Sequence, residues 1–168
     1  MKKDKFLTVF AVFDEKTQTV LQSWQNAIFD AGLVGTQTMG IPFHISLGSF
    51  PTCMEEELIS RIRAVCESSF EFSINLARIN DFGNKVLFLE PEENGDLMRL
   101  HELFDNNYAN GFPFHAHATI FCGDTQDVEK AKNVLKEYFS PIETKIVGIQ
   151  MGEFFPTRMI CCERLTNN

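Results

Sequence analysis

The chain has 168 residues, of which 44% are hydrophobic, and it carries a formal net charge of −8. That length fits one domain or two small lobes with a shared core, and the hydrophobic content excludes a chain that is disordered throughout. A protein that binds long nucleic acid usually presents a basic face. The acidic balance therefore argues against duplex DNA as a partner but is compatible with a small nucleotide or an RNA end.

The cysteines and the apolar runs of the sequence indicate the cellular location of the protein. An odd number of cysteines without regular spacing predicts neither a disulfide framework nor a zinc knuckle, and reduced thiols are typical of the cytoplasm. No run approaches the roughly 20 apolar residues of a membrane span, and the apolar residues behind the basic N-terminus fit a strand better than a signal peptide. We therefore expect a cytoplasmic monomer without a membrane partner. The cysteines are Cys53, Cys66, Cys122, Cys161 and Cys162.

The first half of the chain alternates patterns typical of strands and helices. The strand segments combine aromatic and β-branched residues, and the helical segments space their apolar residues by three and four. Gly32 stands where the first helix is expected to end. The predicted elements are strand 5–13, helix 20–31, strand 43–49, helix 58–66 and strand 70–76.

The second half repeats this order. The predicted elements are strand 85–90, helix 97–104, strand 114–122, helix 128–139 behind the capping residue Asp124, and strands 143–151 and 158–165. Because no linker separates the halves, we predict a single bilobal domain over residues 1–168, with lobe-forming halves of approximately 1–81 and 82–168. The predicted fold class is α+β. Two lobes related by a pseudo-twofold axis, each a mostly antiparallel sheet with helices on its outer face, surround a central cleft.

The same short motif occurs once in each half, on the predicted strands 43–49 and 114–122. The first copy has His44 two residues before Ser46, and the second has His117 two residues before Thr119. Because strand side chains alternate between faces, each histidine shares a face with its hydroxyl residue. A pseudo-twofold axis would aim both pairs into one cleft.

Two imidazoles beside two hydroxyls suit displacement at phosphorus. One group must accept a proton from the nucleophile while another donates a proton to the leaving oxygen, and imidazoles have pKa values suited to both tasks. Hydroxyl groups can hold the charged non-bridging oxygens of the phosphate. This chemistry requires no metal ion.

In these two motifs the chain resembles the 2H phosphoesterase superfamily, and most closely its bacterial 2′-5′ RNA ligase and cyclic phosphodiesterase branch. The resemblance implies the 2H phosphoesterase fold without a cofactor. It also implies that His44 and His117 are the general acid and base, and that Ser46 and Thr119 bind the substrate phosphate. The expected enzyme is a metal-independent phosphodiesterase that acts on 2′,3′-cyclic or 2′,5′-linked phosphates of RNA or small nucleotides, with 2′-5′ RNA ligation as the reverse reaction. Ser46 departs from the more common threonine but keeps the hydroxyl.

Two further side chains are candidates for the same site. Arg158 opens the last predicted strand, and arginine forks onto phosphate well, so we expect it to bind phosphate in this acidic chain. His115 shares a face with His117, and two interpretations stay open: a position at the rim of the cleft, or an exposed histidine at the start of a strand. His101 lies on the apolar face of the third predicted helix and is expected to pack there.

Two alternatives to an enzyme of this class remain open from the sequence. A metalloprotein would use His115 and His117 with His44 and Asp124, and the metal content of the protein would identify it. A nucleotide-binding module without turnover would retain the fold but fail to hydrolyse a generic 2′,3′-cyclic nucleotide.

Overall fold

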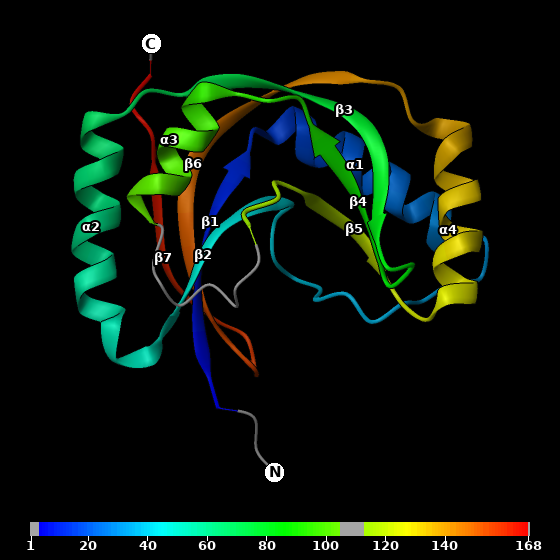
Figure 1. Ribbon diagram of the computed structural model, residues 1–168, viewed down its shortest axis with the longest axis horizontal. Coiled ribbons are helices and arrows are strands. Elements are labelled where there is room, and N and C mark those ends of the chain that lie inside the picture. The colour runs from blue at the N-terminus through cyan, green and yellow to red at the C-terminus, as the bar shows by residue number, and fades with distance from the viewer. Residues whose placement is uncertain (1–3, 105–112, 168) are drawn as a thin grey trace.

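The computed structural model describes residues 4–104 and 113–167 (Figure 1). Its elements follow the predicted order of strands and helices. The strands are β1 (Phe6–Phe13), β2 (His44–Pro51), β3 (Phe72–Phe82), β4 (Val86–Pro91), β5 (Ala118–Cys122), β6 (Ile142–Phe154) and β7 (Arg158–Arg164). The helices are α1 (Glu15–Asp30), α2 (Glu55–Ser68), α3 (Gly95–Leu103) and α4 (Thr125–Tyr138), with a short 3-10 turn at Thr52–Met54.

Short polar side chains set the starts of three helices. Asp14 accepts a hydrogen bond from the N–H of Thr17 at the start of α1, and Asn94 caps α3 in the same way. Asp124 accepts from the N–H of Asp127 and caps α4, as predicted. Each cap satisfies one of the N–H groups that the first helical turn leaves without a partner.

The seven strands of the described residues form one antiparallel sheet, in which equivalent strands of the two repeats stand at matching places counted from the two ends. The path is β2-β1-β6-β3-β4-β5, with β7 paired to β6. The repeat β1-α1-β2-α2-β3 therefore matches β4-α3-β5-α4-β6, and β2 and β5 occupy equivalent ends. At the centre the N-terminal parts of β3 and β6 pair around Ile74 and Thr144. This arrangement confirms the predicted α+β class.

Strand pairing joins the two halves of the chain. β1 pairs with β6 from Phe6 opposite Phe154 to Phe13 opposite Ile146, and β3 pairs with β4. The lobe boundary near residue 81 falls within the last residues of β3. The division of the lobes into residues 1–81 and 82–168 stays a prediction.

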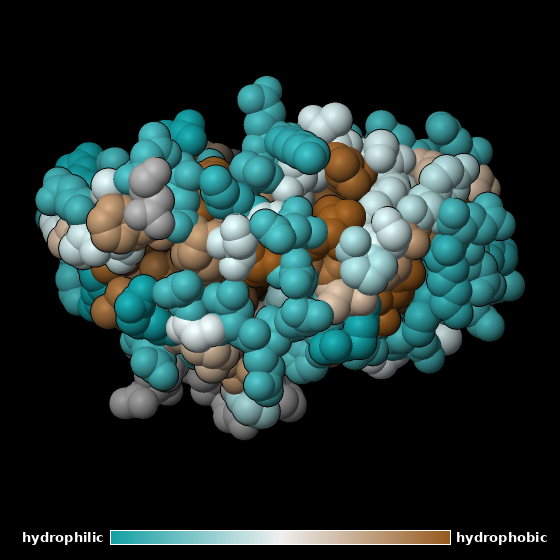
Figure 2. All heavy atoms as spheres, turned by 90° about the horizontal axis from the view of Figure 1, so that it is seen from above, coloured by the Kyte–Doolittle hydropathy of each residue, from teal (hydrophilic) through white to brown (hydrophobic). Residues whose placement is uncertain are grey.

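The helices pack at the two ends of the sheet (Figure 1). α1 and α4 pack on each other and contact β5, whereas α2 contacts β6 and β7, and α3 contacts β2. Viewed from above, hydrophilic side chains cover the ends of the molecule, and hydrophobic side chains show between them in the middle (Figure 2). Within the described residues, no helix is both long and apolar enough to cross a membrane.

β1 is buried on both faces and separates two hydrophobic clusters. Leu7, Val9 and Ala11 belong to the main core, whereas Phe10 and Val12 point to the opposite face. There they form a smaller cluster with Phe154. This smaller cluster lies beneath the first motif, because Phe10 also contacts the ring of His44.

Candidate active site

The first motif lies at the start of β2. His44 is the first residue of this strand, and both His44 and Ser46 are partly exposed, whereas Ile45 and Leu47 are buried. The alternation of faces predicted for this strand is therefore confirmed. The histidine and the hydroxyl lie on the face that is not packed into the main core.

The second motif shows the same alternation but begins before its strand. Thr119 is partly exposed between buried Ala118 and Ile120, and His117 immediately precedes β5. The predicted strand 114–122 is wrong for residues 114–117, which are not in the sheet. Pro91, near the end of the neighbouring strand β4, has no N–H with which to extend the ladder in that direction.

Both motifs carry an irregularity in strand pairing at the same position. Ser46 pairs with Phe10 while Gly48 pairs with Val9, so the register skips one residue after the hydroxyl. Thr119 pairs with Phe88 while Phe121 pairs with Leu87, which is the same skip. A β-bulge bends its strand and re-aims the side chains beside it. The two halves thus bend their motif strands in the same way.

A buried phenylalanine supports each motif histidine. The ring centroids of Phe10 and His44 lie 4.4 Å apart, and those of Phe88 and His117 lie 5.3 Å apart. Both phenylalanines are fully buried, and each pairs with the hydroxyl residue of its own motif. The sequence analysis missed these two residues, because only the strand register reveals their equivalence.

Each histidine is tethered to the carbonyl group two residues before it. His44 Nδ1 lies 2.7 Å from the carbonyl oxygen of Pro42, and His117 Nδ1 lies 2.7 Å from that of His115. A carbonyl can only accept, so each Nδ1 carries a proton and donates it. In the neutral ring Nε2 is then the nitrogen with a free lone pair, and it can exchange a proton with a substrate.

Burial lowers the pKa of both histidines. For His44, burial has the largest effect, the hydrogen bond to Pro42 opposes it, and the charge of His117 lowers the pKa further. For His117, burial again dominates, the hydrogen bond to the His115 carbonyl opposes it, and the charge of His115 adds to the lowering of the pKa.

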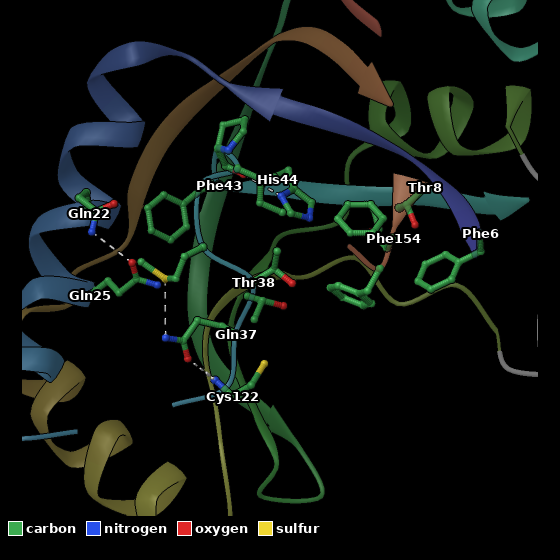
Figure 3. A pocket seen from close by; sticks show the side chains of 17 residues that line it. Phe6, Thr8, Gln22, Gln25, Gln37, Thr38, Phe43, His44, Cys122 and Phe154 are labelled. Carbon is green, nitrogen blue, oxygen red and sulfur yellow. Dashed lines mark hydrogen bonds between the residues drawn. The ribbon is translucent and has the colours of Figure 1, made fainter. Parts of the chain in front are cut away.

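A cavity of about 280 Å³ brings three of the motif residues together (Figure 3). His44, Ser46 and Thr119 line it. β2 contacts β5, although the two strands stand at opposite ends of the strand order. Within the described part of the chain, the lining does not include His117, whose ring packs edge-on against Phe82 at 4.9 Å.

Uncharged side chains from several elements complete the cavity wall. One wall is the loop 37–42, which Gln37 ties to β5 by accepting a hydrogen bond from the N–H of Cys122 at 3.1 Å. The opposite rim is aromatic: the ring centroid of Phe155 lies 6.2 Å from that of Phe6 and 5.3 Å from that of Phe154. The motif did not point to these residues, because they come from loops and from strands distant in sequence.

The structure places Arg158 with carboxylates and outside the cavity lining. Its guanidinium lies 2.8 Å from Glu55 Oε2 and 3.4 Å from Glu153 Oε1. Hydrogen bonds to these partners raise the pKa of Arg158. Its role as a phosphate ligand stays a prediction.

His115 and His101 have partners of their own. His115 Nε2 lies 2.7 Å from Glu90 Oε1, so this side chain is engaged beside the second motif, and the residues described as lining the cavity do not include it. His101 stacks on Phe114 at 3.7 Å and donates from Nδ1 to the carbonyl of Leu47, which confirms that it is packed.

The ligand set of a metalloprotein is not assembled in the described part of the chain. Within residues 4–104 and 113–167, no three His, Cys, Asp or Glu side chains are grouped so that they could hold a metal ion. Asp124, which the metal interpretation requires, accepts a backbone hydrogen bond at the start of α4.

The profile of the 2′-5′ RNA ligase superfamily matches residues 13–153. The chain belongs to this superfamily. The match confirms the resemblance to the 2H phosphoesterases inferred from the two motifs, and the superfamily is one of phosphoesterases. A search of curated protein sequences gives no match.

Solved structures of the superfamily share the fold over nearly the whole chain. LigT of E. coli in its apo form aligns with a TM-score of 0.65 and 11% identity, covering 98% of this chain and 99% of LigT. TT0787 of Thermus thermophilus aligns with a TM-score of 0.63 and 14% identity, covering 97% of this chain and 99% of its own. A third structure, named as a phosphoesterase, gives a TM-score of 0.62 and 14% identity over 96% and 99% of the two chains.

Proposed function

We propose that this superfamily member is a phosphodiesterase for 2′,3′-cyclic or 2′,5′-linked phosphates of RNA ends or small nucleotides, with His44 and His117 as the acid–base pair. One observation carries the proposal. Two imidazoles are tethered in the same way beside two hydroxyls that line one cavity, so each motif offers a free Nε2 and a hydrogen-bond donor.

Hydrolysis of a cyclic phosphate assigns one proton transfer to each histidine. A water oxygen attacks phosphorus, and its proton passes to the Nε2 of the neutral histidine. The bond from phosphorus to one ribose oxygen breaks, and that oxygen takes the proton from Nε2 of the charged histidine. The ring is opened to a phosphomonoester. With a ribose 5′-hydroxyl in place of water as the nucleophile, and with the bond from phosphorus to O3′ as the one that breaks, the same two proton transfers would form a 2′,5′ linkage.

Ser46 and Thr119 are proposed to bind the non-bridging oxygens of the phosphate. Both hydroxyl residues line the cavity, and each lies two residues from a motif histidine. Donors held in place where charge accumulates stabilise a transition state more than the ground state. A β-bulge follows each of the two hydroxyl residues, so the two motif strands have the same local geometry. This equivalence supports the same role for both hydroxyls.

The residues that line the cavity support a nucleotide as the ligand. Phe6, Phe154 and Phe155 form an aromatic rim on which a base could stack, and Gln22 and Gln25 line the wall. LigT of E. coli has been crystallised with 3′-AMP, ATP, NADP+ and phosphate. We propose a small nucleotide or RNA end as the partner, without duplex DNA and without a cofactor, for an enzyme that acts as a monomer in the cytoplasm.

The decisive experiment is an activity panel over 2′,3′-cyclic mononucleotides and over 2′,5′- and 3′,5′-linked dinucleotides, in the presence of EDTA. We expect turnover of the 2′-linked substrates by the wild type and none by the double variant His44→Ala/His117→Ala. Loss of activity on chelation, restored by one divalent metal, would favour the metalloprotein instead. Binding of these nucleotides without turnover would favour the binding module.

A further inference from the structure

The two motif histidines are tethered alike, but different groups hold the accepting carbonyls. In the first motif the carbonyl belongs to Pro42, whose ring fixes φ, and Gln18 of α1 clamps the following peptide. The N–H of Phe43 donates to Gln18 Oε1 at 2.8 Å, and the carbonyl of Phe43 accepts from Gln18 Nε2 at 2.8 Å. A ring and two hydrogen bonds therefore fix the backbone that orients His44.

In the second motif a side chain provides the anchor. The accepting carbonyl belongs to His115, which precedes β5 and lies outside its ladder. His115 Nε2 lies 2.7 Å from Glu90 Oε1, within ion-pair distance. Glu90 lies on β4 and is itself held from β3, because it accepts from Arg78 Nε at 3.1 Å and from Asn80 Nδ2 at 3.3 Å.

The rings of His115 and His117 also share two aromatic neighbours, Phe82 and Phe88, and the Phe88 ring centroid lies 5.7 Å from that of His115 and 5.3 Å from that of His117. The Phe82 ring centroid lies 5.3 Å from that of His115 and 4.9 Å from that of His117, and both contacts are edge-on. Although the His115 side chain is 44% exposed, its ring is held on two sides, by Glu90 and by Phe82. A histidine held in this way can fix the peptide to which it belongs.

We propose that His115 is a positioning residue for His117. Its contact with Glu90 fixes the carbonyl that accepts the Nδ1 proton of His117, and so keeps Nε2 as the free nitrogen. His115 thus fixes the accepting carbonyl of the second motif, as Pro42 and Gln18 fix that of the first. The inference rests on the proposed function only for its kinetic consequence, because the tautomer of His117 can be measured without substrate.

The direct test is heteronuclear NMR of the imidazole nitrogens at slightly alkaline pH, where both motif rings are neutral. In the wild type we expect the Nδ1–H tautomer for His44 and His117. In His115→Ala and in Glu90→Ala, His117 should gain an Nε2–H population, because its accepting carbonyl is no longer held. His44 is the internal control and should keep its signals. His115→Gln should restore the His117 tautomer, since its side-chain N–H can reach Glu90.

Kinetics provide the second measurement. Both alanine variants should lower kcat by about 10–100-fold, as found for partners that orient metal-bound histidines, with KM unchanged. The double variant should be no worse than either single variant, because the two residues act as one unit. An unchanged Nδ1–H tautomer of His117 in both alanine variants would overturn the proposal. A changed tautomer with undiminished kcat would uphold the positioning role and contradict the acid–base role of His117 instead.

Discussion

At the scale of single residues, the site is defined by two histidines with the same tether and unequal surroundings. His44 lines the cavity and rests on Phe10, whereas His117 rests on Phe88 and Phe82 beside it. The duplicated motif predicted from the sequence that each histidine shares a face with its hydroxyl residue, and the catalytic and phosphate-binding roles of these residues stay predictions. It could not predict the supporting phenylalanines, because their positions depend on pairing with a neighbouring strand.

Alanine at either motif histidine should reduce kcat by at least ~10²-fold, because general acid–base groups contribute ~10²–10⁴-fold. The double variant should lose far less than the product of the two single losses, since both groups act on one displacement. Steady-state kinetics on a 2′,3′-cyclic nucleotide measure both effects. His101→Ala is the matched control, because this histidine is packed outside the cavity lining of the described residues. A single motif variant with undiminished kcat would remove that histidine from the mechanism.

The pH dependence of kcat/KM should be bell-shaped, with its maximum below pH 6.5. One imidazole must be neutral and the other protonated in the same turnover, so the rate falls when both are charged or both are neutral. Burial lowers both pKa values below the ordinary value of 6.5, and the maximum lies between them. The two apparent pKa values belong to the pair. Each single histidine variant should lose one limb, and a flat profile from about pH 5 to pH 8 would contradict the assignment, since an ordinary imidazole titrates within that range.

Ser46→Ala and Thr119→Ala should each weaken transition-state binding by about 2.7–4 kcal/mol if the hydroxyl acts as an oxyanion-type donor. Urea unfolding should show little change in stability, because both side chains are partly exposed at the cavity. Thr19→Ala on α1 is the control, since its hydroxyl donates to the helix carbonyl of Glu15 and is exposed. Kinetics close to wild type in both cavity variants would assign the hydroxyls a structural role.

At the scale of elements, hydrophobic patterns predicted the existence and order of every strand and helix, but not all of their limits. Helix α1 begins five residues before the apolar stripe that indicated it, because Asp14 caps a polar first turn. The strand that carries Thr119 is shorter than predicted, although its apolar pattern extends back to Phe114. Alternation shows which residues share a face, whereas hydrogen bonding to a neighbouring strand decides where a strand begins.

The hairpin between β6 and β7 supplies Phe154 and Phe155 of the aromatic rim, and Phe155→Ala tests the role of this rim. Base stacking on an aromatic side chain contributes about 1–3 kcal/mol, so KM for a nucleotide should rise while kcat changes little. Phe155 is 60% exposed and lines the cavity, so its loss should leave the core intact. Phe70→Ala is the matched control, because Phe70 is 54% exposed and is not among the described residues that line the cavity. Equal KM values in wild type and Phe155→Ala would exclude stacking on this ring.

At the scale of the whole molecule, the repeat was predictable and its assembly was not. Element order and the paired motif indicated two equivalent halves. The pairing of β1 with β6, and that of β3 with β6 at the centre of the sheet, depend on contacts between residues far apart in sequence. Local sequence patterns do not identify which strands pair, because any amphipathic strand of suitable length fits the same pattern.

The two partly buried motif histidines should also make the whole fold less stable in mild acid. Their folded-state pKa values are lowered, so between pH 6.5 and those values the unfolded chain binds more protons than the folded one, and the free energy of unfolding decreases as the pH falls. The carboxylates of Asp81, Glu90 and Glu153 have lowered pKa values, and their contribution to the free energy of unfolding is lost only in stronger acid. Urea unfolding at about pH 7.5 and pH 5.5 brackets the unperturbed histidine pKa. We expect a smaller difference between these two pH values for His44→Gln than for the wild type, and an equal difference would show that His44 does not contribute.

The pairing of β1 with β6 also has a consequence for how the protein is made. β1 leaves the ribosome before β6, the strand that covers its second edge and ends at Phe154. Until then β1 can form a hairpin-like pair with β2 only, with one edge open to solvent or to other chains. Contacts between distant segments slow folding, so this apolar strand keeps one edge unpaired in the nascent chain until β6 has been synthesised. The cavity beside His44 therefore forms only after the end of β6 has been synthesised, because Phe154 and Phe155 line it.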